Sequence, residues 1–234
     1  MRKLQEEIVP SNIRPTDAWL SFELAFVGGY GDAAGFVLAK TFTGHVTGNL
    51  VLGAIAVAAR DWRASLGHFS AILTFLIGVL LSTLIVRPLN AWSAWPMLPT
   101  IMGMEVILIG TASLVLASHV PHGAELFVIG VCLALALQNG AFRHVGGISV
   151  HTTYLTGMIT SLISTEAERY SFVVPPSVTA PDSKTHVLCG IWIAFVAGAG
   201  IGAAMVFHFG ALGMLGAALL LIILIVNSVA SQRK

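Results

Sequence analysis

Long apolar segments dominate the sequence and restrict the folds that it can adopt. Eight of them follow one another along the chain, separated by short polar connections: residues 17–39, 46–59, 68–86, 100–118, 124–142, 152–165, 186–207 and 209–230. A helix needs roughly 20 residues to cross the hydrocarbon core of a bilayer, and six of the eight segments come close to that length. The sequence therefore predicts an all-α membrane protein, a helical bundle with six to eight transmembrane spans.

The composition supports this class and excludes others. Charged residues make up 10% of the chain, against about 25% in soluble domains. We therefore expect the lipid bilayer as a partner. The formal net charge is +1, so we expect no binding to nucleic acid. The chain has no HExxH or CxxC spacing and no Gly-x-Ser-x-Gly motif. We therefore expect no metal, no cofactor and no enzymatic activity.

The stretch Val27–Leu50 is unusual for a membrane segment. Four of its residues between positions 28 and 35 are glycine, and Asp32 lies among them. A carboxylate at the centre of a spanning helix costs about 2.5–3.5 kcal/mol on insertion scales, and paired glycines invite bends. We expect a helix break here. Asp32 either relays a proton, holds a cation or contacts substrate, or is a buried acid satisfied by backbone donors at the break.

The chain also resembles itself at a distance. A shift of 109 residues aligns Gly31 with Gly140 and Thr47-Gly48 with Thr156-Gly157, and apolar segments of similar length flank both copies. This pattern predicts a duplication. After a cytosolic tail of residues 1–16, we expect two repeats of four helical elements, residues 17–118 and 119–234, which together form one membrane domain. The second element of each repeat is short.

Polar side chains gather beside both predicted breaks. Interrupted helices expose free N–H and C=O groups, which are natural sites for ions and solutes. The candidate substrate-binding residues are Asp32, His45, Thr47, Asn49, Gln138, Asn139, Arg143 and Thr156. Thr47 and Thr156 could instead bond to their own helix backbone. Because equivalent parts of a duplicated fold meet near its axis, we expect these two threonines to pack close together.

Each half has one charged residue at a position where the aligned residue of the other half is alanine. Asp32 aligns with Ala141, and Arg143 aligns with Ala34. A buried acid strongly prefers a partner, so the alignment predicts an ion pair between Asp32 and Arg143. The alternative is that Arg143 extends to the lipid headgroups. A second acid, Glu105, lies near the start of segment 100–118, where we expect an interfacial position.

Small residues recur every four positions in two segments, as Thr74, Gly78 and Ser82 and as Ala194, Gly198 and Gly202. Such ladders allow close packing of helices. The distribution of Lys and Arg predicts that both termini are cytoplasmic. It does not choose between four crossings per half, which gives parallel repeats, and three, which gives inverted repeats. The 19 residues between Lys40 and Arg60 favour eight crossings.

Four motifs carry a resemblance to a known family: Gly29–Ala33, His45–Leu50, Leu137–Ala141 and Thr152–Gly157. In this order they resemble the YoaK-like family of bacterial membrane proteins over nearly the whole chain. The sequence departs from the family pattern at Gly140 and Phe142, where Ala and an aliphatic residue are expected. The resemblance implies a polytopic protein of the bacterial inner membrane. It supplies neither a substrate nor a mechanism.

Taken together, these features predict a secondary transporter or channel for a small polar solute or ion, multi-pass in the bacterial inner membrane. The alternative is a non-transporting membrane sensor or assembly factor. Whether the chain forms a homo-oligomer stays open.

Overall fold

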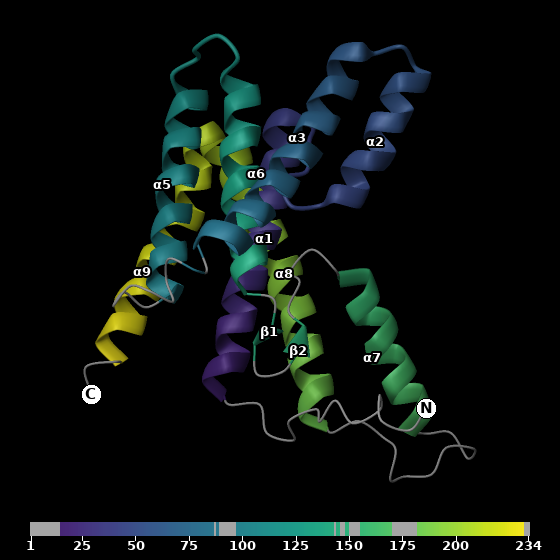
Figure 1. Cartoon of the computed structure of the whole chain (residues 1–234), viewed down its shortest axis with the longest axis vertical. Helices are drawn as coiled ribbons and strands as arrows, with labels where there is room; N and C mark the ends of the chain where they lie inside the picture. The colour runs from purple at the N-terminus through teal and green to yellow at the C-terminus, as the bar shows by residue number, and fades with distance from the viewer. Residues whose placement is uncertain are drawn as a thin grey trace.

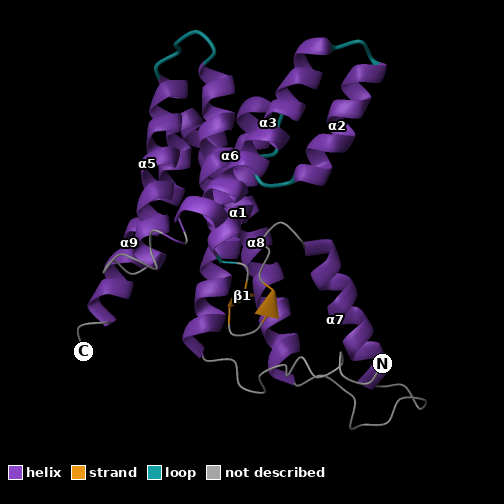
Figure 2. Ribbon diagram, viewed as in Figure 1, coloured by secondary structure: helices purple, strands orange, loops and turns teal. Residues whose placement is uncertain are grey.

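The computed structural model describes residues 15–86, 88, 97–142, 144–145, 148–149, 155–169 and 182–231. Helices dominate it (Figures 1 and 2): α1 (Pro15–Ala39), α2 (Val46–Ala58), α3 (Trp62–Leu81), the π-helical η1 (Ser82–Val86), α5 (Met97–Ala117), α6 (Gly123–Ala141), α7 (Leu155–Arg169), α8 (Asp182–Phe209), the 3₁₀-helical η3 (Gly210–Met214) and α9 (Leu215–Ser231). The predicted all-α membrane class is confirmed. The strands in the described ranges are the two-residue β1 (His144–Val145) and β2 (Ile148–Ser149), which pair antiparallel.

The lengths of the helices separate spanning from short elements. Five helical stretches in the described part are long and apolar enough to cross a membrane, and the last of them, Thr185–Ala230, covers most of α8 and most of α9. The helix α2 has 13 residues and α7 has 15, so each is only about 20 Å long at 1.5 Å per residue, against about 30 Å of hydrocarbon core. The preference for eight crossings is therefore not supported, because residues 40–45 are not helical and shorten the second element.

The two small-residue ladders pack as predicted, and they do so between distant parts of the chain. The helix α8 lies along α1, where a Cβ added at Gly198 would overlap the backbone of Phe26. The helix α3 lies along α6, where a Cβ added at Gly78 would come 2.5 Å from Ala136 Cβ and Ser82 Oγ donates to Leu137 O at 3.0 Å. In both pairs the contacts advance in the same direction along the two helices, because Gly202 meets Tyr30 four residues after the first contact and Gly140 meets Ser82. The helices of each pair therefore run parallel.

The remaining long helices complete the core. The helices α5 and α6 form an antiparallel hairpin, and α9 packs against α5. Large buried side chains such as Leu24, Met102 and Phe127 fill the space between α1, α5 and α6. Many other large apolar side chains point outward, as expected for a surface in contact with lipid.

The predicted helix break at the glycine cluster is wrong. The helix α1 continues without interruption from Pro15 to Ala39, and the chain leaves the helix only at residues 40–45. The glycines make room for neighbouring segments, because a Cβ at Gly29 would overlap the Phe195 carbonyl and one at Gly31 would come 3.0 Å from Leu135. The cluster therefore serves close packing instead of bending the helix.

The directions of the helices matter for the site. The helices α1 and α6 run antiparallel, because Gly31 faces Leu135 while the Leu24 carbonyl accepts from Gln138. The short helices α2 and α7 extend toward opposite ends of the molecule, and the start of α1 and the end of α9 lie at the same end (Figure 1).

Candidate functional site

The connection between α1 and α2, residues 40–45, folds back along the last two turns of α1 and is held there by Asp32. This side chain is 5% exposed. Its Oδ1 atom accepts hydrogen bonds from the backbone N–H groups of Thr43, at 3.0 Å, and Gly44, at 2.6 Å. Charge-assisted bonds of this kind are about twice as strong as neutral ones. The buried acid is therefore satisfied by backbone donors, which was one of the two alternatives for Asp32.

The other oxygen of Asp32 binds His45. The His45 Nδ1–H donates to Asp32 Oδ2, and the pair bridges the helix and the connection. This hydrogen bond raises the pKa of His45, burial opposes the rise, and the negative charge of Asp32 adds to it. The imidazole also contacts α8, with its ring centroid 5.7 Å from that of Phe195. His45 thus links the acid on α1 to a helix of the other half of the chain.

Asn49 fixes the same connection from the α2 side. Its Oδ1 atom accepts from the Phe42 N–H at 3.0 Å, and its Nδ2 atom donates to the Phe42 carbonyl at 2.7 Å. Glycines on both helices leave space for this arrangement, since a Cβ added at Gly35 would lie 2.6 Å from Thr43 Cγ2 and one at Gly48 would lie 2.9 Å from the Phe42 ring. The structure therefore joins three predicted site residues, Asp32, His45 and Asn49, around one connection.

Thr47 and Thr156 do not belong to this cluster. Both are exposed, contrary to the predicted packing of the two Thr-Gly elements against each other. In α2 the reason is local: Gly48 faces Phe42, and successive residues of a helix point about 100° apart, so Thr47 faces outward.

Gln138 and Asn139 lie outside this cluster and donate to backbone carbonyls. Gln138 Nε2 donates to the Leu24 carbonyl of α1 at 3.1 Å, while Asn139 Nδ2 donates to the Leu135 carbonyl one turn earlier at 2.8 Å. Arg143 lies outside the described residues, so its ion pair with Asp32 stays a prediction. Asp32 already has three donors from the connection.

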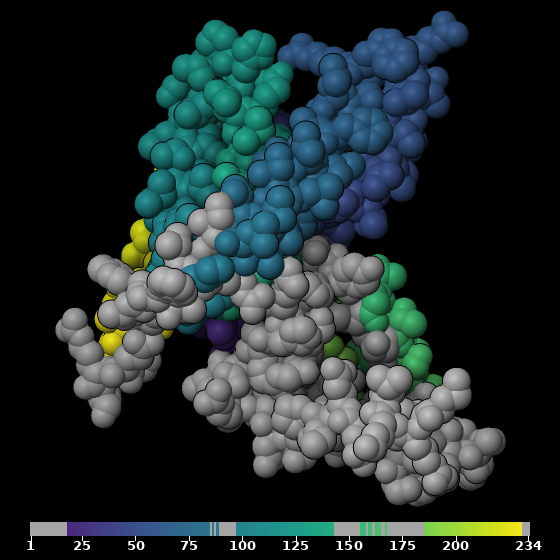
Figure 3. Space-filling view, viewed as in Figure 1, coloured from purple at the N-terminus to yellow at the C-terminus, as the bar shows by residue number. Residues whose placement is uncertain are grey.

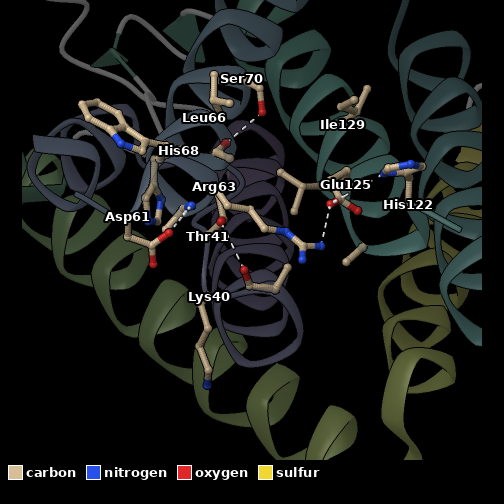
Figure 4. Close-up of a pocket in the computed structure, with 16 residues that line it drawn as sticks. Lys40, Thr41, Asp61, Arg63, Leu66, His68, Ser70, His122, Glu125 and Ile129 are labelled. Atoms are coloured by element: carbon tan, nitrogen blue, oxygen red, sulfur yellow. Dashed lines mark hydrogen bonds and ion pairs between the residues drawn. The ribbon is translucent and has the colours of Figure 1, made fainter. Parts of the chain in front are cut away.

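A cavity of about 1040 Å³ lies on the far side of the same connection (Figure 4). It is bordered by the end of α1, the start of α3 and the start of α6, and Lys40 and Thr41 of the connection line it. At this end of the molecule the α2–α3 and α5–α6 hairpins stand apart (Figure 3).

Charged groups face one another across the cavity. Arg63 of α3 approaches Glu125 of α6, with Nη2 and Oε1 3.4 Å apart, and both side chains are well exposed. His68, which is 7% exposed, also lines the cavity, and its Nδ1 atom has no hydrogen-bond partner among the described residues. Sequence reasoning missed these residues as a group, although two acids near helix starts, Asp61 and Glu125, are a usable signal.

Comparisons with known proteins indicate the family to which this chain belongs. The "UPF0700 transmembrane protein YoaK" of Bacillus subtilis (strain 168) is 24% identical to this chain over 151 residues, which cover 64% of the chain and 67% of that protein. No solved structure matches. With the apolar helices, this relative supports a multi-pass membrane protein. A family model described as "Protein of unknown function (DUF1275)" matches residues 20–227. This match covers most of the chain, so the protein belongs to the DUF1275 family, which confirms the resemblance to YoaK-like proteins.

Proposed function

We propose that this protein is a secondary transporter or channel for a small polar solute or ion. One observation carries the proposal: a single non-helical connection, residues 40–45, joins the partly buried Asp32–His45 pair to a cavity that is bordered by charged groups and lies between apolar helices. Irregular backbone at membrane depth is tolerated where it is enclosed by protein or lines a water-filled cavity. Transporters use such interruptions to bind solutes and ions.

The groups around the cavity suit a polar solute. Lys40, Arg63 and Glu125 offer charges, and the buried Nδ1 of His68 lacks a hydrogen-bond partner in the described part of the chain. A buried polar atom without a partner is costly, and a bound solute or water would satisfy those that face the cavity. The connection forms one wall, so a solute that passes beyond it requires the connection to move. The bonds from Asp32 to Thr43, Gly44 and His45 hold this segment against α1.

The packing of the helices also suits a duplicated transporter. Under the 109-residue shift, α1 corresponds to α6, and a shift of 120 residues places Gly78 on Gly198 and Ser82 on Gly202. Gly198 and Gly202 pack against α1 at Phe26 and Tyr30, while Gly78 and Ser82 pack against α6 at Ala136 and Gly140. The two parallel pairs thus correspond to each other, and α1 and α6 are antiparallel. We infer two inverted repeats, the arrangement that alternating access exploits.

We place the protein in a bacterial inner membrane with both termini cytoplasmic, as the distribution of Lys and Arg predicts. In this orientation α1 begins on the cytoplasmic side, and the cavity at the other end of the molecule opens outward.

The proposal is tested by solute flux in proteoliposomes. Stopped-flow light scattering would follow uptake along gradients of a neutral polyol, a zwitterionic amino acid and a monocarboxylate. We expect flux of at least one of them above that of empty vesicles, and its loss in Asp32→Asn. Glu23→Gln is the matched control, because it removes an acid from the same helix at a position that does not line the cavity. No flux of any of these solutes would favour the sensor or assembly role.

A further inference from the structure

Glu105 is a buried acid outside the Asp32 cluster. It is the ninth residue of α5, and its side chain is 0% exposed. Neither carboxyl oxygen has a hydrogen-bond partner among the described residues. An ionised carboxylate in such a place loses its hydration without compensation, which costs several kcal/mol or more.

The neighbouring helices supply no counterion. The helix α5 packs against α6, η3 and α9, and none of residues 97–117, 123–141 and 210–231 is Lys, Arg or His. The other titratable side chains in these ranges are Glu125, at the far end of α6, and the thiol of Cys132. The helix α1, which packs against α6, adds the acids Asp17, Glu23 and Asp32 and no Lys, Arg or His. The surroundings therefore favour an uncharged carboxyl at Glu105.

An uncharged carboxyl needs an acceptor for its O–H group. The α5–α6 hairpin places one at the same level: Gly130 packs against Ala112 and the Leu108 carbonyl, and Ile101 clusters with Leu137. Between these contacts, Glu105 faces α6 at about Ala134–Gln138. The Oε1 atom of Gln138 is buried and lacks a donor in the described part of the chain, while the Nε2 atom of the same amide donates to the Leu24 carbonyl.

We propose that Glu105 and Gln138 form a proton-binding site in the membrane interior, in which the Glu105 O–H donates to Gln138 Oε1. One proton on the Glu105 carboxyl gives Gln138 Oε1 a donor and gives a Glu105 oxygen a hydrogen bond. Neither atom has another partner among the described residues. The site also has a mechanical connection, because Gln138 ties α6 to the carbonyl of Leu24, two turns before Asp32 on α1. The role of this proton as the coupling ion rests on the proposed transport function, whereas its presence does not.

Infrared difference spectroscopy tests the site directly, with the proton itself as the probe. At about pH 8, exposed glutamates are ionised, so a protonated carboxyl band belongs to a shielded acid. We expect this band in the wild type, with the intensity of one group per chain, and its complete loss in Glu105→Gln. The amide of this variant has nearly the same shape and still donates to Gln138. Asp32→Asn is the control, since its loss should remove a carboxylate band instead.

Two further measurements test the site at Glu105 and Gln138. Gln138→Met should shift the protonated band to higher frequency, because the acceptor is gone; an unchanged frequency would overturn the pairing. If Glu105→Gln does not fold, ¹³C-labelled glutamate in the wild-type chain identifies the band by its isotope shift. Only carboxylate bands in the labelled protein would refute the site. A protonated Glu105 in a protein that moves no solute would refute the transport function alone.

Discussion

The helices α1 and α6 begin the two predicted repeats, yet they hold their neighbours differently. The helix α1 meets α8 backbone to backbone, since a Cβ at Gly198 would overlap the carbonyl of Phe26. The helix α6 meets α3 through small side chains, since a Cβ at Gly140 would come 2.6 Å from Ser82 Cβ. The polar groups differ as well: Asp32 of α1 secures a connection, while Gln138 of α6 secures another helix. Tolerance to change should therefore differ between the halves.

The largest effect is expected in the α1–α8 pair. Gly198→Ala should destabilise the protein by at least about 3 kcal/mol, the upper range for overpacking, because a backbone carbonyl cannot rotate away as a side chain can. Thermal unfolding in detergent and the yield of monodisperse protein would measure it. Gly200→Ala is the control on the same helix, where an added Cβ meets nothing within 4 Å and a neutral or slightly stabilising effect is expected. Equal stability of the two variants would contradict the close approach.

The second comparison is between the loss of the Asp32 carboxylate and the loss of the Gln138 amide. Asp32→Ala removes the acceptor of two backbone N–H groups and the partner of His45, which should cost about 2–3 kcal/mol. Gln138→Met removes the bond to Leu24 and should cost about 1 kcal/mol from that bond.

The two variants should also differ in where the protein loosens. Thr43 is buried, so a cysteine placed there should react slowly with a thiol reagent in the parent and in Gln138→Met. It should react much faster in Asp32→Ala, because the connection is released. Equal labelling in all three backgrounds would show that Asp32 does not hold the connection.

The sequence was sufficient for the positions of the helices and for their packing ladders, because both depend on local patterns. Hydropathy located the long helices and the two short ones, and four-residue spacing identified Gly198 and Gly78 as contact points. Side-chain partners depend on the fold and were missed. Asp32 bonds to residues 11–13 positions later because the connection folds back, and no pattern in the sequence encodes this reversal. The burial of Glu105 could not be predicted, because distance from a helix end says nothing about what covers a side chain.

A smaller effect is expected in the α3–α6 pair. Gly140→Ala brings a new methyl group against Ser82, and it should cost about 1–2 kcal/mol, because its approach of 2.6 Å is a milder overlap than that of a Cβ at Gly198 with the Phe26 carbonyl. Ser82→Gly removes the obstacle, so the double variant should recover part of the loss, measured as non-additive changes in the unfolding free energy. Gly103→Ala on α5, where an added Cβ has open space, controls for the general effect of alanine. Strict additivity would mean that the two residues do not touch.

The smallest effect concerns pH and belongs to the first half alone. The hydrogen bond and charge of Asp32 raise the pKa of His45 in the folded protein above its unfolded value of about 6.5. The folded state therefore binds a proton more tightly than the unfolded state. The stabilisation is complete below about pH 6.5 and is lost as the pH rises through the folded-state pKa. Part of the His45 side chain, 28%, is exposed, so we expect a change below about 1 kcal/mol.

This change can be separated from other titrations by difference. Unfolding midpoints from about pH 6 to pH 9 would be compared between the wild type and His45→Gln, which retains a donor to Asp32 but no titrating group. The wild type should lose its advantage over His45→Gln as the pH increases, and in an Asp32→Asn background the two curves should become parallel. A constant difference between the wild type and His45→Gln across this range would show that His45 does not exchange a proton on unfolding. The second half has no counterpart to this pair among its described residues, because Gln138 and Asn139 do not titrate. A pH dependence that survives both substitutions must therefore arise elsewhere, and the Arg63–Glu125 contact at the cavity is too exposed to supply it at neutral pH.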